Sequence, residues 1–162
     1  MILPLVPRDH SLLTTELEPF DFSNPPTDPI QLAKDLTETM LHHNGIGLAA
    51  NQVGLPYRVF VIKSNPILAC FNPKIVSITG EEVDLEEGCL TFPNYYVKIR
   101  RPKMIRVRYT YPNGNTVTEI YDGITARIFQ HELDHLNGVL FTSRATLYHR
   151  ERAERNAKRT KK

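Results

Sequence analysis

The sequence has little cysteine and no long apolar run, and both absences narrow its class. Its two cysteines, Cys70 and Cys89, are fewer than a secreted disulfide scaffold usually carries. No apolar stretch approaches the roughly 18 residues that a membrane-spanning helix needs. The opening segment, MILPLVPRDH, lacks the apolar core and small-residue cleavage site of a secretion signal. The sequence therefore predicts a cytoplasmic protein with no membrane partner, whose thiols stay reduced and can bind metal.

Length and composition are those of one globular domain, but the charge is unevenly spread. The chain has 162 residues, 41% hydrophobic and 23% charged, with a net charge of +2. Residues 150–162 carry seven basic and two acidic side chains, so the rest of the chain is net negative. We expect a catalytic domain over residues 1–145 and a basic C-terminal helix or tail over residues 146–162. Such a tail can contact nucleic acid or an acidic surface, or it can be a solvated helix end.

The order of the predicted elements is typical of an α+β domain. Asp28 and Pro29 suit the start of a helix that Asn44 and Gly45 end. We expect antiparallel or mixed sheets packed in one domain around a second, central helix that carries an H-E-x-x-H motif. The predicted strands are residues 57–62, 75–78, 104–111 and 116–121, with an extended piece at 139–141. The second helix covers residues 124–136, and a third begins near residue 145.

The strongest local signal is HELDH, residues 131–135, within the predicted second helix. Residues four apart lie on the same face of a helix, so His131 and His135 can direct two imidazoles at one ion. Glu132 lies one residue on, within reach of a water at that ion. Two neutral nitrogen ligands and a general base are the physical content of this motif.

Two histidines do not complete a catalytic site, which commonly takes three protein ligands and a water. One candidate for the third ligand is Cys89, in the apolar stretch EEGCLTFP, where Gly88 permits close backbone approach. The other is Glu154, which an ordinary H-E-x-x-H peptidase would use, although it lies in the charged tail. Cys70 is interpreted as a core residue.

Three separated segments together resemble the peptide deformylase family. They are GIGLAANQ at 45–52, EGCLTFP at 87–93 and QHELDHLNG at 130–138. Their order and spacing are similar to those of the family, over roughly residues 28–141. The resemblance implies a hydrolase that removes the formyl group from the N-terminal formyl-methionine of new polypeptides and releases formate.

The resemblance also implies a cofactor and partners. The family's metal is bound by the cysteine and both histidines, which correspond to Cys89, His131 and His135. Fe²⁺ is the implied native ion, and Zn²⁺, Ni²⁺ or Co²⁺ can replace it; the chemistry of the donors alone would favour Zn²⁺. The implied partners are nascent formyl-methionyl peptides, with a possible ribosome contact through the basic tail.

Residue roles follow from the same resemblance. Glu132 is the expected general base, while the Gln52 side chain and the Leu90 backbone N–H are expected to stabilise the oxyanion. The apolar candidates for the methionine pocket are Ile46, Leu85, Ile124 and Ile128, which could equally be core residues. The expected substrate-binding residues are Gly45, Ile46, Gly47, Leu85, Glu87, Gly88, Ile124, Ile128 and His131.

Three positions depart from the family pattern. Asn51 stands where the family often has proline, and Tyr96 stands where many members carry arginine. Arg127 stands where some members have an aliphatic residue, and we expect its stem to line the pocket while its charge reaches water. Asp134 is expected to pair with a nearby arginine such as Arg101.

Overall fold

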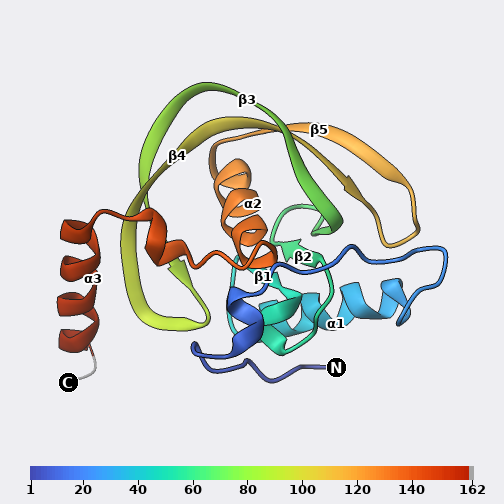
Figure 1. The fold of residues 1–162 in the computed structure, drawn as a ribbon, viewed down its shortest axis with the longest axis horizontal. Helices are drawn as coiled ribbons and strands as arrows, with labels where there is room; N and C mark the ends of the chain where they lie inside the picture. Colours follow the sequence, from blue (N-terminus) through green and yellow to red (C-terminus); the bar gives the residue numbers. More distant parts are fainter. Residues whose placement is uncertain (161–162) are drawn as a thin grey trace.

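The computed structural model describes residues 1–160, which form one five-stranded antiparallel sheet with three α-helices (Figure 1). The strands follow one another across the sheet in chain order, and every neighbouring pair is antiparallel. The predicted α+β class and the antiparallel alternative are thus confirmed. The strands are β1 (Gly47–Ala49), β2 (Val59–Ile62), β3 (Leu68–Cys89), β4 (Phe92–Thr110) and β5 (Thr116–Asp122). The helices are α1 (Pro29–His42), α2 (Gly123–Leu136) and α3 (Leu147–Thr160), with 3-10 turns at Ser11–Thr14, Ala50–Val53 and Phe141–Arg144.

Helix α1 begins and ends as its sequence predicts. The Asp28 carboxylate accepts a hydrogen bond of 2.9 Å from the Ile30 N–H, which satisfies one of the free donors of the first turn. At the other end Asn44 adopts φ +57, and the Gly45 N–H donates to the Met40 carbonyl. The chain then leads directly into β1 and the site.

Strands β3 and β4 are far longer than predicted. The expected strand at 75–78 lies inside a strand of 22 residues, and that at 104–111 lies inside one of 19. Irregularities in the pairing, such as that between Thr79 and Glu82, interrupt the alternation of apolar residues. The full strand lengths could therefore not be predicted from the period-two pattern. In Figure 1 the two strands curve together as a ribbon over α2.

Helix α2 is the most enclosed of the three α-helices. Every residue from Ala126 to Leu136 is buried. Phe129 packs edge-on against Phe60 of β2, with ring centroids 5.0 Å apart, and joins Ile105 and Val107 of β4 in one cluster. Cys70, predicted to be a core residue, is fully buried in the same cluster. The helix is thus fixed from several sides.

The C-terminal region differs from its prediction. Leu140 has an extended backbone, but no strand covers residues 139–140 and a 3-10 turn begins at Phe141, so the extended piece predicted at 139–141 does not reach its last residue. Helix α3 is more than a solvated end, because Ala153 is buried and packs beside Phe92, Val97 and Phe141. The last two residues of the predicted tail lie outside the described part of the chain. Among the described residues, no helix combines the length and apolar character needed to span a bilayer.

Candidate metal centre and pocket

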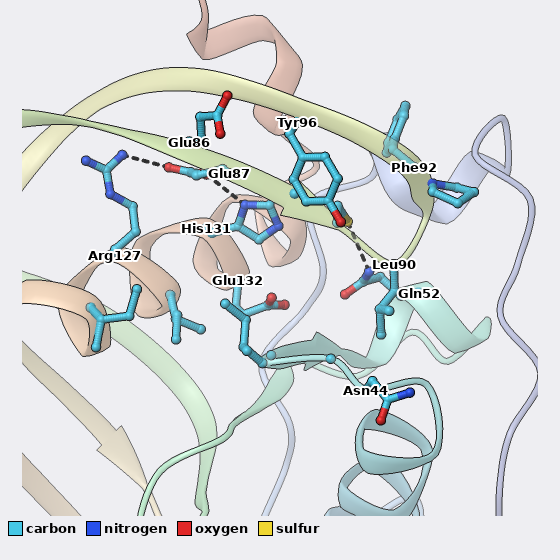
Figure 2. Close-up of a pocket in the computed structure, with 18 of the residues that line it drawn as sticks. Asn44, Gln52, Glu86, Glu87, Leu90, Phe92, Tyr96, Arg127, His131 and Glu132 are labelled. Atoms are coloured by element: carbon cyan, nitrogen blue, oxygen red, sulfur yellow. Dashed lines mark hydrogen bonds and ion pairs between the residues drawn. The ribbon is translucent and has the colours of Figure 1, made fainter. Parts of the chain in front are cut away.

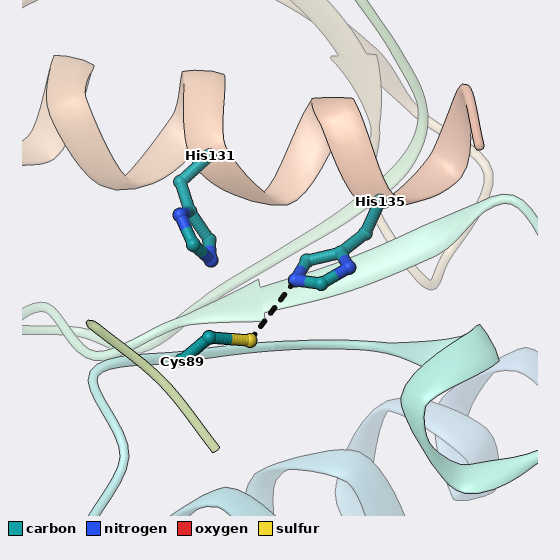
Figure 3. Close-up of side chains that lie close together, drawn as sticks. All are labelled: Cys89, His131 and His135. Atoms are coloured by element: carbon teal, nitrogen blue, oxygen red, sulfur yellow. Dashed lines mark hydrogen bonds between the residues drawn. The ribbon is translucent and has the colours of Figure 1, made fainter. Parts of the chain in front are cut away.

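Cys89, His131 and His135 meet at one point between β3 and α2. One donor atom from each lies within 4.8 Å of the other two, and Cys89 Sγ is 3.3 Å from His135 Nε2 (Figure 3). One thiolate sulfur and two imidazole nitrogens form a donor set that suits a divalent ion such as Fe²⁺ or Zn²⁺. The three residues present therefore fit the metal that the sequence implies.

The two elements supply these side chains for different reasons. His131 and His135 are one turn apart on α2, so both rings project from the same face. Cys89 is the last residue of β3, where the register shifts: Gly88 pairs with Tyr96, but Cys89 pairs with Phe92. The irregular pairing directs the sulfur toward the helix.

Glu154, the alternative third ligand, does not join this group. It is exposed on α3, and the Cys89 cluster is the one group of three potential ligands found within residues 1–160. The geometry therefore favours the cysteine over the carboxylate.

Glu87 connects one candidate ligand, His131, to two arginines. Its carboxylate lies 2.8 Å from His131 Nδ1 and accepts two hydrogen bonds from Arg101, at 2.6 and 3.0 Å. Arg127 adds another at 2.8 Å. Burial acts to raise the pKa of Glu87, but the bonds from His131 and Arg101 outweigh it and lower the pKa to about 2. Glu87, predicted to bind substrate, thus has its oxygens engaged by the protein and orients the His131 ring.

Arg127 is buried, so the prediction that its charge reaches water was wrong. Besides Glu87, its guanidinium donates to the Ile99 carbonyl at 2.9 Å and to the Val83 carbonyl at 2.6 Å. No local pattern around Arg127 indicated these contacts, because all three acceptors lie on β3 and β4, about 28 to 44 residues away in the chain. Arg127 does line the pocket, as predicted.

Asp134 forms the predicted pair with Arg101. Its Oδ2 accepts from Arg101 at 2.9 Å. Arg144 also binds Asp134, through two bonds of 2.7 Å. Arg144 was not predicted as a partner of Asp134, because it lies in the 3-10 turn after α2 and reaches Asp134 only once that turn folds back onto the helix. Arg101 thereby links Asp134 to Glu87, and α2 is joined by charge to β3 and β4.

Cys89 and His131 have strongly shifted pKa values. Burial disfavours the Cys89 thiolate, but the charges and hydrogen bonds of His135 and His131 hold the pKa of Cys89 well below that of an ordinary thiol. Burial likewise acts against a charged His131, while Cys89 and Glu87 raise its pKa to about 10. The sulfur is therefore prepared as a thiolate, the form that binds metal.

Gln52 reaches the same place from the 3-10 turn after β1. Its Oε1 accepts from the Ala49 N–H at 2.9 Å, which orients the amide. Its Nε2 then donates to Thr91 Oγ1 at 3.0 Å and faces Cys89 Sγ at 3.3 Å. Thr91 was missed by the sequence analysis, because a threonine after a strand has many ordinary uses.

Glu132 is buried beside β1, where glycine makes room for it. A Cβ on Gly47 would lie 2.7 Å from Glu132 Oε1 and 2.9 Å from a methyl carbon of Ile128. Oε2 of Glu132 has no hydrogen-bond partner within the described chain, and burial raises the pKa of Glu132 to about 7. A carboxylate with such a pKa exchanges protons readily near neutral pH.

A cavity of about 500 Å³ opens beside these groups (Figure 2). Leu85 is 42% exposed on β3 and does not line it, so the structure does not bring Leu85 to the pocket. Tyr96 does line it and lies over Gly88, where a Cβ would approach the tyrosine ring to 2.6 Å. The predicted site residues that line the pocket are Gly45, Ile46, Gly47, Gln52, Glu87, Gly88, Cys89, Leu90, Ile124, Ile128, His131 and Glu132.

Comparisons with known proteins agree with this arrangement. Residues 2–151 match the family described as polypeptide deformylase. The chain belongs to this family. It is 50% identical over 110 residues to the peptide deformylase of Thermotoga petrophila, which covers 67% of each chain. Two solved deformylases also match it. That of Synechococcus elongatus, in complex with actinonin, has a TM-score of 0.88 at 34% identity, covering 95% of this chain and 85% of the other. That of Acinetobacter baumannii bound to Met-Ala-Ser has a TM-score of 0.81 at 33% identity, covering 89% and 98%.

Family membership defines the type of chemistry. A deformylase is a metal-dependent hydrolase that removes the formyl group from the amino terminus of a polypeptide, and this chain is an enzyme of that class. The three donors described above are its possible metal site.

Proposed function

We propose that Cys89, His131 and His135 bind the catalytic ion, and that the pocket beside them accepts the formyl-methionyl end of a nascent chain. The observation that carries the proposal is the convergence of the three donors next to the buried Glu132. Fe²⁺ is the proposed native ion, from the family resemblance, and Zn²⁺, Ni²⁺ and Co²⁺ suit the same donors. A divalent ion there supplies Lewis acidity and makes hydroxide available from water near neutral pH.

Glu132 is the proposed general base. Its carboxylate is buried and has one oxygen without a protein partner, so it can accept a proton from the attacking water. The same group then returns that proton to the nitrogen of the departing amine. The C–N bond breaks, and formate and a free amino terminus are released. The raised pKa of Glu132 suits both directions of transfer.

Gln52 and Leu90 are the proposed stabilisers of the negative charge that develops on the formyl oxygen. The Gln52 amide is oriented by Ala49 so that its N–H groups face Cys89 and Thr91, on the side of the pocket. The Leu90 backbone N–H follows the candidate ligand Cys89 directly. Removal of one such donor costs roughly 10²–10³ in turnover.

The apolar side of the pocket is proposed to bind the methionine side chain. Ile46, Ile124 and Ile128 line it, and Ile128 is almost wholly buried while the other two are more than half exposed. Gly45 and Gly47 leave backbone beside the cavity, where an extended substrate can pair with β1 in the manner of an added strand. The Met-Ala-Ser complex of the Acinetobacter baumannii protein supports a peptide of this kind as ligand.

Formate release from formyl-Met-Ala-Ser tests the proposal. Iron-loaded protein protected from oxygen should release formate, and Glu132→Gln should retain its iron while losing about 10²–10⁴-fold of the turnover, as expected for loss of a general base. Glu154→Gln on α3 is the matched control and should behave as the wild type. Wild-type turnover in the glutamine variant at position 132 would overturn the assignment of the base.

We also propose that the exposed basic face of α3 contacts ribosomal RNA, in a cytoplasmic setting. Arg155, Lys158 and Arg159 are exposed there, while Ala153 packs on the opposite side. Neutralising these three residues to glutamine should reduce co-sedimentation with ribosomes, most clearly at low salt. The matched control is the same change at three exposed basic residues of β4, Lys103, Arg106 and Arg108. Equal losses in both variants would show that only net charge matters and would remove the proposed contact.

A further inference from the structure

We propose that Asn51 is a positioning residue that connects the Gln52 turn to the end of α2 that carries His135. This inference rests on the proposed function, because it concerns how two parts of that site are placed relative to each other. Asn51 is polar but fully buried, and it lies within the segment GIGLAANQ, directly before Gln52. It is not among the residues that line the pocket, and it supplies none of the three candidate ligand atoms.

The contacts of Asn51 are with backbone alone. Its Nδ2 donates to the His135 carbonyl at 2.7 Å and to the Leu12 carbonyl at 3.1 Å, so both amide hydrogens are used. The opposite orientation of the amide would place its oxygen against two carbonyl oxygens and is excluded by repulsion. One side chain thus joins the turn Ala50–Val53, the helix α2 and the N-terminal turn Ser11–Thr14.

The bond to His135 satisfies a backbone carbonyl near the C-terminal end of α2. His135 is the penultimate residue of α2, and the last four carbonyls of a helix lack partners within it. The Gly138 N–H reaches the same carbonyl at 3.1 Å, and Asn51 supplies the shorter bond. Asn51 therefore fixes the backbone of the candidate ligand His135.

The position of Gln52 depends on the same turn. Gln52 Oε1 accepts from the Ala49 N–H, so the direction of its Nε2 toward Cys89 and Thr91 follows the turn's backbone. Asn51 is the adjacent residue in that turn. If the turn is released from α2, the amide of Gln52 and the imidazole of His135 can move independently of each other.

The unused oxygen of Asn51 supports a geometric role. Its Oδ1 is buried and has no hydrogen-bond partner among residues 1–160. Burying an unsatisfied acceptor is unfavourable, so an apolar side chain would be the better residue if this position only filled space. The two donors are the feature that an aliphatic side chain cannot reproduce, and they also distinguish Asn51 from proline, which the family often has here.

A double-mutant cycle between Asn51 and Gln52 tests the inference. Asn51→Leu keeps the branched shape of the side chain and removes both donors. We expect kcat to fall by about tenfold to a hundredfold with KM nearly unchanged, because orientation and not binding is lost. Gln52→Ala should then cost several-fold less in the Asn51→Leu background than in the wild type, since its donor is already misplaced. Asn51→Thr keeps one donor, so its kcat should lie between those of the wild type and Asn51→Leu. It replaces the leucine variant in the cycle if that variant fails to fold.

A second readout does not depend on activity. Apoprotein loaded with Co²⁺ alone has visible absorption bands that report the arrangement of its ligands, and Asn51→Leu should shift these bands while binding the ion in equal amount. The matched control is Asn72→Gly, which removes another bridging amide: Asn72 exchanges two hydrogen bonds with the Phe20 backbone, far from the site. This variant should lose stability but leave both the bands and the cost of Gln52→Ala unchanged.

The outcomes distinguish failure of the proposed deformylase function from failure of the positioning role of Asn51. If wild-type protein releases no formate, the proposed function fails, whatever Asn51 does. If the wild type is active but Gln52→Ala costs the same factor in all backgrounds and the Co²⁺ bands do not move, Asn51 is only a structural residue and the inference is overturned.

Discussion

Helices α2 and α3 have the same length and both pack against β4, yet their charged side chains differ in burial and in pairing. In α2, Arg127 and Asp134 are buried and each is paired with partners from distant segments. In α3, the charged residues are mostly exposed, and no salt bridge within residues 1–160 involves them. A charged helix in a sequence can therefore be either a solvated face or the centre of a site, and the partners decide which.

The largest expected effect comes from comparing a substitution at Cys89, which faces α2, with one at Glu154 on α3. Cys89→Ala removes a proposed ligand, so we expect the purified protein to lose most of its bound ion and all measurable turnover. Glu154→Ala should keep both, because its carboxylate is exposed and outside the cluster. Metal analysis beside the formate assay measures the difference. Loss of the ion in the Glu154 variant alone would reverse the ligand assignment.

The next effect concerns stability. Asp134→Asn leaves Arg101 and Arg144 without their shared carboxylate, and breaking such a buried pair costs about 3–5 kcal/mol. Urea unfolding of the apoprotein measures this loss without a contribution from bound metal.

Its matched control is an exposed pair on the same sheet. Asp84 on β3 pairs with Arg100 on β4 in open solvent, so Asp84→Asn should change the unfolding midpoint little. Equal shifts in the two variants would mean that burial does not distinguish the charges of α2 from those elsewhere.

The smallest effect tests whether α3 is attached at all. Ala153→Glu places a carboxylate against Phe92 and Val97, and we expect a loss of about 1–3 kcal/mol with normal turnover of short formyl peptides. The exposed Glu151→Ala is the comparison and should leave the melting temperature unchanged. An unchanged melting temperature in Ala153→Glu would show that the helix is free in solution.

Local chemistry in the sequence predicted the parts of the site that depend on local spacing. The helical repeat of His131 and His135, the glycine before Cys89 and the cap at Asp28 each involve neighbours in the chain. The Asp134–Arg101 pair, proposed from charge alone, was also confirmed. Such features need only the geometry of one element and a plausible partner.

The remainder depended on contacts that no local pattern contains. Arg127 seemed able to reach water, and only the position of Glu87 on β3 shows why it is buried. Leu85 has the composition of a pocket residue, but it lies on the exposed part of the strand. Asn51 looked like a turn residue replacing a proline, and its two acceptors come from segments about 40 and 84 residues away.

The irregular pairing of β3 with β4 has a consequence for how this gene can change. Because side chains alternate between faces, Glu87 and Cys89 both face α2, and a residue inserted between them would turn either the carboxylate or the sulfur away from the helix. An insertion beside Gly80, where the pairing already shifts and the chain is exposed, can be absorbed without altering the phase of the strand beyond it. Natural length variation in this ribbon should therefore gather near Gly80 and be absent from the stretch that leads to the sulfur.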